Sequence, residues 1–132
     1  MNGSTSSTAS QDAGDDVSIL MASFATDLDD PAMAVALIAD FSVRDGTQQR
    51  IASAFADAMQ RMAGDPGMLT YEVHRERHAP TRFVVYERWR SLADLDAHLR
   101  TPYVRTLRRL IDEVLVGDPA FRVLIPVRQR AR

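Results

Sequence analysis

The chain lacks cysteine and lysine entirely and has only one tryptophan in 132 residues. Without cysteine it can form no disulfide and no thiolate nucleophile, which is compatible with a reducing cytoplasm, the location we predict. A long hydrophobic run is also missing. The best candidate, residues 17–25, is about half the length that a bilayer span requires, and aspartates rather than basic residues precede it. We therefore expect no membrane partner.

Charge is distributed unevenly along the chain. Residues 1–30 carry six aspartates and no arginine, whereas all 16 basic residues, every one an arginine, lie after them. The start of the chain is rich in Ser, Thr and Asp and offers little apolar surface to bury. We predict a mobile acidic extension over residues 1–30, one folded domain over 31–128 and a basic tail over 129–132. For residues 17–25, docking on the domain and disorder remain alternatives.

Hydrophobic periodicity predicts strands and a helix in the first half of the domain. Alternating apolar residues predict a strand over 34–43. An apolar stripe at helical spacing predicts a helix over 47–63. Two more strands are predicted over 68–77 and 82–90, with a turn at 78–81 between them.

Helix-capping residues predict where helices begin in the second half of the domain. Ser91 is a plausible helix N-cap, and Thr101-Pro102 is a second cap with proline at the first helical position. The apolar stripe then continues to Leu115, and Gly117 is expected to end the helix before a last strand over 120–127. The order βαββαβ predicts an α+β, ferredoxin-like fold, with a four-stranded antiparallel sheet and two helices on one face.

Two helices cover only one face of such a sheet. Ala36 and Ile38 on the first strand and Leu124 on the last are apolar positions on the face opposite to the helices. We therefore expect a homodimer formed through the open sheet face.

A group of aromatic and titratable residues gathers between residues 67 and 98, namely Tyr71, His74, Glu87, Trp89 and His98. Each also has a structural interpretation. Trp89 can be a core aromatic, His98 a core histidine and His74 part of a solvated strand face. Glu87 shares the inward face with Trp89, and such a buried carboxylate needs an arginine or the His98 ring as partner.

Metal and nucleic-acid sites are not supported. His74 and His78 are four residues apart but straddle a strand and a turn, so their rings do not converge on one metal ion. The arginines of the second helical region lack interleaved stacking aromatics, which favours a solvated face over a nucleic-acid surface. These arginines are Arg100, Arg105, Arg108 and Arg109.

Three motifs together resemble the antibiotic biosynthesis monooxygenase (ABM) family. They are the DPGMLTY entry into the second strand, the FVVYERW third strand and the LDAH helix followed by Thr101-Pro102. The resemblance covers about residues 33–127 and implies a dimeric α+β barrel. Its members include cofactor-free oxygenases that convert phenols or quinols into quinones, haem-degrading enzymes and proteins that act on small signalling molecules.

The resemblance to the quinone-forming members assigns roles to residues. The strand histidine of those enzymes corresponds to His74, their strand tryptophan to Trp89 and their helix arginine to Arg108, with Arg109 if the register slips. His74 is the expected base, His98 is the alternative base, and Trp89 and Arg108 would orient the substrate.

This chain departs from the quinone-forming pattern at two positions. Val85 replaces a strand asparagine and Leu95 replaces a helix tyrosine, so the polar network around a phenolic oxygen is incomplete. The first strand contains no asparagine, which disfavours the haem-degrading branch. The expected substrate pocket lies between the sheet and the helices and is lined by Tyr71, Val85, Glu87 and Leu95.

The resulting expectation is a cofactor-independent monooxygenase. It would use O2 to oxidise a small electron-rich aromatic substrate, a phenol, quinol or polyketide-like compound, to a quinone. No cofactor and no metal are expected. The alternatives are a non-catalytic small-ligand-binding domain of this fold and a haem-binding or haem-degrading member.

Overall fold

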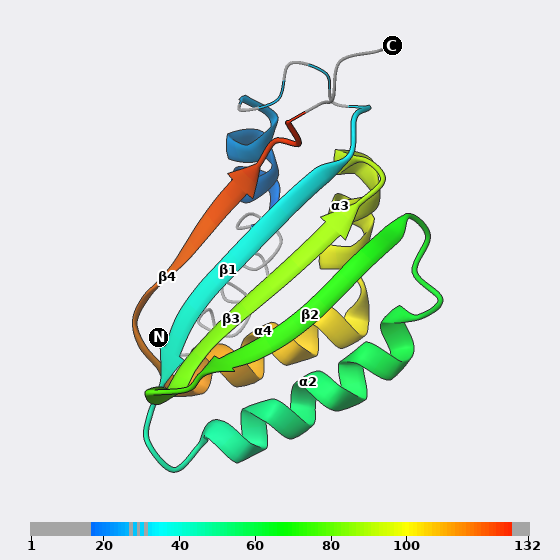
Figure 1. Cartoon of the computed structure of the whole chain (residues 1–132). Helices are drawn as coiled ribbons and strands as arrows, with labels where there is room; N and C mark the ends of the chain where they lie inside the picture. The colour runs from blue at the N-terminus through cyan, green and yellow to red at the C-terminus, as the bar shows by residue number, and fades with distance from the viewer. Residues whose placement is uncertain (1–16, 27, 29, 31, 128–132) are drawn as a thin grey trace, which may run out of the picture.

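One antiparallel sheet with helices packed against one of its faces forms the domain (Figure 1). The computed structural model describes residues 17–26, 28, 30 and 32–127. The strands are ordered β2-β3-β1-β4, which confirms the predicted ferredoxin-like βαββαβ fold, with the second helical region divided in two. The elements are β1 (Val35–Val43), α2 (Gln48–Met62), β2 (Met68–Glu76), β3 (Ala79–Trp89), α3 (Leu92–Leu99), α4 (Pro102–Val114) and β4 (Leu115–Leu124).

The hairpin between β2 and β3 is tighter than predicted. The sequence indicated a turn over 78–81, but β3 already begins at Ala79, which pairs with Glu76. Pro80 therefore lies inside a strand. It is tolerated there because β1 pairs with β3 only as far as Arg82, so one edge of β3 has no neighbouring strand at Pro80.

The last strand also begins earlier than the predicted residue 120. α4 ends at Val114, and β4 follows at Leu115 without a loop. Gly117, which we expected to end the helix, lies within β4 with a φ of +72°. The pairing of β4 with β1 shifts register near this glycine, and such an irregularity favours a residue without a side chain. The strand ends at Leu124 rather than at residue 127.

Alternate residues of the central strands face the helices and form two groups of buried side chains. The first, which we call the Trp89 cluster, includes Leu37, Leu95 and Leu99. The second, the phenylalanine cluster, is built around Phe41, Phe55 and Phe83, whose ring centroids lie 5.5 to 6.2 Å apart. Together they make up the core between the sheet and the helices.

Residues 17–26 form an additional helix within the predicted N-terminal extension. Val17 and Phe24 are buried in the Trp89 cluster, as is Leu28 just after the helix. Of the two alternatives for this segment, the structure therefore supports docking on the domain, because three apolar side chains leave water there. Residues 1–16 and the basic tail 129–132 lie outside the described residues, and the division into three segments stays a prediction.

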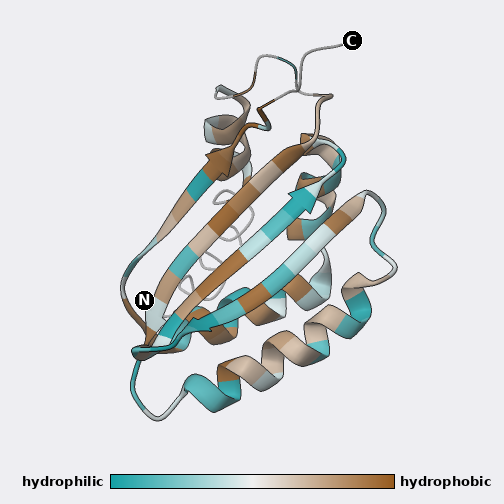
Figure 2. Cartoon of the chain, viewed as in Figure 1, coloured by the Kyte–Doolittle hydropathy of each residue, from teal (hydrophilic) through white to brown (hydrophobic). Residues whose placement is uncertain are grey.

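Among the described residues, no helix lies on the opposite face of the sheet. Register places Ala36, Ile38, Tyr86 and Leu124 on this outer face, as expected for the first and last strands. Figure 2 shows β1 as mostly apolar and β2 as more polar. Among the described residues, no helix combines the length and the apolar character needed to cross a membrane.

Candidate active site

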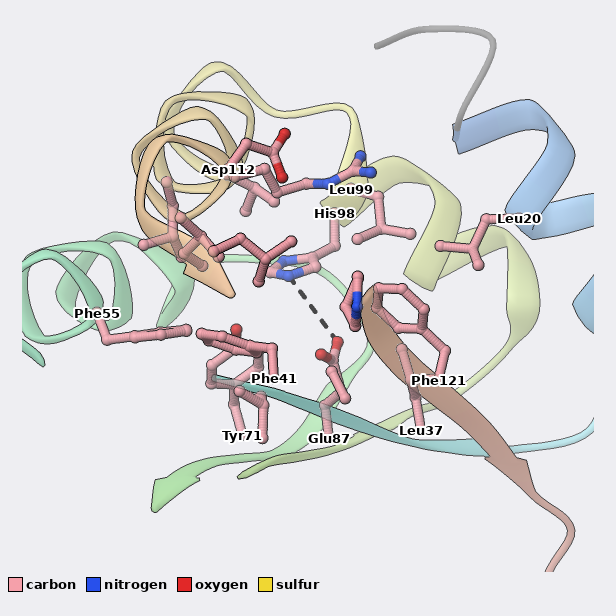
Figure 3. A pocket seen from close by; sticks show the side chains of 18 of the residues that line it. Leu20, Leu37, Phe41, Phe55, Tyr71, Glu87, His98, Leu99, Asp112 and Phe121 are labelled. Carbon is pink, nitrogen blue, oxygen red and sulfur yellow. Dashed lines mark ion pairs between the residues drawn. The ribbon is translucent and has the colours of Figure 1, made fainter. Parts of the chain in front are cut away.

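A cavity of about 470 Å³ lies between the helix-covered face of the sheet, α4 and the helix at residues 17–26 (Figure 3). It is placed where the two core clusters meet. Leu37 and Leu99 come from the Trp89 cluster, and Phe41 and Phe55 from the phenylalanine cluster. A mostly apolar cavity of this size with a few convergent polar groups is typical of a small-molecule site.

His98 is a buried basic side chain in the wall of this cavity. It lies in the last turn of α3 with 2% of its surface exposed. Its Nδ1 is 2.8 Å from a carboxylate oxygen of Asp65, and its Nε2 is 4.0 Å from Oε1 of Glu87. The Asp65 carboxylate favours the tautomer with the proton on Nδ1, which leaves the lone pair on Nε2, on the Glu87 side of the ring.

A tight turn before β2 brings Asp65 to the histidine. Pro66 follows Asp65, Gly67 has a φ of +78°, and the N–H of Met68 donates to the Asp65 carbonyl at 3.5 Å. This is the pattern of a turn with proline and glycine at its centre. A side chain at position 67 would collide with Asp94, so the glycine is needed for space as well as for its φ.

The Glu87 side chain projects from β3 into the protein and is 4% exposed. The Trp89 indole N–H donates to Glu87 Oε1 at 2.8 Å. Burial raises the pKa of Glu87 to about 7, although the hydrogen bond from Trp89 opposes the shift. Glu87 therefore changes protonation near neutral pH.

Burial also shifts the neighbouring groups towards their neutral forms. It lowers the pKa of His98, against the opposing effect of Asp65. It raises the pKa of Tyr71 well above its usual value, with Glu87 adding to the shift. The Tyr103 hydroxyl donates to Asp65, and burial together with that bond raises the pKa of Tyr103. At neutral pH the site thus contains a neutral imidazole and two neutral phenols.

Five of the residues singled out from the sequence line the cavity, namely Tyr71, Val85, Glu87, His98 and Arg108. Arg108, rather than Arg109, faces it. Trp89 and Leu95 are fully buried behind the lining, and the Trp89 ring centroid lies 4.4 Å from that of His98. These two residues support the site from behind and do not line the cavity.

His74 is not brought together with the other site residues. It lies on the outer face of β2, where its side chain is 60% exposed and its Nε2 is 3.3 Å from Glu72. The reason is strand alternation, because the adjacent Val73 pairs with the inward-facing Val85.

Asp65 and Tyr103 are site residues that we did not select from the sequence. Asp65 begins the DPGMLTY motif, so the motif that carries the family resemblance was the available signal. Tyr103 follows the Thr101-Pro102 cap directly, and no sequence pattern marked its hydroxyl. Among residues 17–26, 28, 30 and 32–127, no group of three or more His, Cys, Asp or Glu side chains could hold a metal ion.

Comparison with known proteins identifies the same domain. The family model described as antibiotic biosynthesis monooxygenase matches residues 34–110. A crystal structure titled antibiotic biosynthesis monooxygenase is 21% identical with a TM-score of 0.68, and the match covers 71% of this chain and 99% of that one. Rv0793 from Mycobacterium tuberculosis is 24% identical with a TM-score of 0.66, covering 74% and 99%.

A third solved structure, a Bacteroides thetaiotaomicron protein of unknown function described as a possible oxidoreductase, is 15% identical with a TM-score of 0.64. That match covers 70% of this chain and 97% of the other. At these identities the structures establish a shared fold. The comparison with curated proteins found no match.

Proposed function

The chain belongs to the antibiotic biosynthesis monooxygenase family, and on this premise we propose that it is a monooxygenase that oxidises an electron-rich phenol or quinol with O2 without a cofactor. The observation that carries the proposal is the Asp65–His98 pair beside an apolar cavity. The carboxylate fixes the imidazole so that the unprotonated Nε2 is free to accept a proton from a bound substrate.

The substrate must supply the electrons in such a reaction. His98 Nε2 removes the phenolic proton of the substrate. A ring carbon ortho or para to the resulting phenolate oxygen then transfers electrons to O2 and forms a C–O bond, giving a peroxide. Loss of the remaining proton on that carbon and cleavage of the O–O bond leave a carbonyl and release water. One oxygen atom enters the product, the other leaves as water, and the proton on His98 returns to the leaving oxygen.

The neighbouring residues would divide the supporting roles. Trp89 was expected to orient the substrate, but its N–H already donates to Glu87, so we assign it the positioning of that carboxyl group. Glu87, with a pKa of about 7, can donate a proton to the departing oxygen when it is protonated. Arg108 lines the cavity from α4 and can stabilise a phenolate.

We also propose that the protein forms a homodimer through the outer face of the sheet. Leu124 is 37% exposed on this face, and Val116 on the same strand is 53% exposed. Ile38 lies between them on β1, on the same outer face. A second copy would remove these apolar side chains from water.

Oxygen uptake by purified, metal-stripped protein tests the proposed reaction, with an anthrone as substrate. His98→Asn keeps a side-chain N–H for Asp65 but removes the basic nitrogen. If His98 is the base, the rate should fall by roughly 100-fold or more. The matched control is His74→Asn, which makes the same change at an exposed position on the other face and should leave the rate unchanged.

The Asp65→Asn variant tests whether Asp65 acts by positioning the His98 ring. Because Asp65 raises the pKa of His98, its loss should move the rising limb of the pH–rate profile to lower pH and reduce the plateau. A folded His98→Asn protein with native activity would refute the assignment of the base. Binding of the anthrone without oxygen uptake by the native protein would refute the oxygenase and favour a ligand-binding domain.

A further inference from the structure

The helix at residues 17–26 belongs to the wall of the cavity although it precedes the part of the chain that matches the family. The family match begins at residue 34. Ile19, Leu20 and Ser23 of this helix nevertheless line the cavity. The cavity of this protein is therefore completed by a segment that lies outside the matched domain.

The helix is firmly held in this position. Val17 and Phe24 are 2% and 3% exposed within the Trp89 cluster, which also contains Leu99 of α3. The guanidinium group of Arg100 donates to the Ser18 hydroxyl at 3.2 Å. Because these contacts lie on the face that meets the domain, Leu20 is brought to the cavity next to them.

The two ionisable groups at the centre of the cavity lie away from Leu20. In Figure 3, His98 and Glu87 lie at the centre, and Leu20 lies on the far side of Leu99 and Phe121 from them. Helix 17–26 contains no charged residue. An anionic group placed against this wall would lose hydration without gaining a cation from the helix, whereas an alkyl or aryl group would gain from burial.

We propose that helix 17–26 determines substrate specificity, with Ile19 and Leu20 forming a wall that selects phenols and quinols carrying an apolar substituent. The proposal rests on the proposed function, since it names the substrate class of the same site. The ionisable ring would lie near His98 and Glu87, and its alkyl or fused-ring substituent would lie along the helix. Ile19 is 67% exposed, so it forms the outer rim of this wall.

Binding of a hydroquinone series tests the wall without requiring turnover. Hydroquinone, methylhydroquinone and hexylhydroquinone are titrated under anaerobic conditions into the native protein. The fluorescence of Trp89, the only tryptophan, reports occupation of the site because its ring lies beside His98. Affinity should rise with chain length by up to about fourfold for each buried methylene.

Ile19→Asp places a carboxylate at the rim, where the exposed position leaves the fold intact. It should weaken binding of hexylhydroquinone at least tenfold and leave hydroquinone binding unchanged. Ala22→Asp is the matched control, because it adds the same charge to an exposed residue of the same helix that does not line the cavity. Its affinities should equal those of the native protein.

The outcomes separate the two proposals. Three results would overturn the proposed role of helix 17–26. They are affinities that do not depend on chain length, an absence of binding, and an Ile19→Asp protein that binds the series as the native protein does. Length-dependent binding that Ile19→Asp abolishes supports it. If such binding occurs without any oxygen uptake, the wall stands and the proposed oxygenase reaction is wrong.

Discussion

Replacing Glu87 by glutamine should stabilise the protein at alkaline pH and have little effect at acid pH. The substitution keeps the shape of the side chain and an oxygen that can accept the Trp89 N–H bond, which is 2.8 Å long in the native protein. It removes only the ability to ionise. The change in stability therefore reports the free energy of placing a carboxylate at this 4% exposed position.

The size of the effect follows from the pKa of Glu87. Burial raises this pKa from 4.5 to about 7, which corresponds to about 3 kcal/mol at about 1.4 kcal/mol per pH unit. Because the folded-state pKa is the higher one, the folded protein binds the proton more tightly than the unfolded chain. The associated stability is fully present below pH 4.5 and is lost as the pH rises through about 7. The Glu87→Gln variant does not lose this stability as the pH rises, because glutamine does not ionise.

Urea unfolding of both proteins at pH 5 and pH 8 measures the effect. The stability of Glu87→Gln relative to the native protein should rise by about 3 kcal/mol between these values, or by roughly 10 °C in Tm. Glu72→Gln is the control, since Glu72 is a half-exposed carboxylate on the outer face of β2. It should stay within about 0.5 kcal/mol of the native protein at both pH values. A difference between Glu87→Gln and the native protein that does not change with pH would refute the raised pKa.

Three further predictions concern the scaffold. Phe24→Ala should reduce the free energy of unfolding by about 3 kcal/mol or more in urea titrations, because the ring is 3% exposed; native stability would refute the docking of helix 17–26. Gly67→Ala should destabilise more than Gly46→Ala in urea titrations, because both glycines have positive φ but only a side chain at position 67 would collide with Asp94. It should also lower oxygen uptake, because the turn at Gly67 brings Asp65 to His98. Ile38→Arg should convert the proposed dimer into a monomer in light scattering, and a native protein that is already monomeric at tens of micromolar would contradict the interface.

The fold could be predicted because its signal is local. Apolar alternation in the strands and the stripe on α2, with Ile51, Phe55, Ala58 and Met62 buried, are visible in short windows of sequence. The errors arose at Pro80 and Gly117. Both residues usually interrupt regular structure, but each lies in a strand where the missing neighbour or the shifted register accommodates it. Whether a strand can contain such a residue depends on how distant strands pair, which short windows of sequence do not show.

The candidate site was predictable in part for the same reason. Period-two alternation placed Glu87 on the inward face, and helical spacing from Leu95 placed His98 beside the core. The contact between His98 and Asp65 joins residues 33 positions apart, so no local pattern reveals it. His74 was selected through the family resemblance, whereas alternation from Val73 places it on the outer face.

The direct passage from α4 to β4 ties the walls of the cavity to the sheet. No loop separates Val114 from Leu115, and the Arg44 N–H donates to the Val114 carbonyl at 2.8 Å, which ties this corner to the end of β1. Arg108 and Phe121 lie on either side of the corner and both line the cavity. This corner therefore couples two walls of the cavity to the end of β1, so a substitution that loosens it would change the shape of the cavity as well as the stability of the sheet.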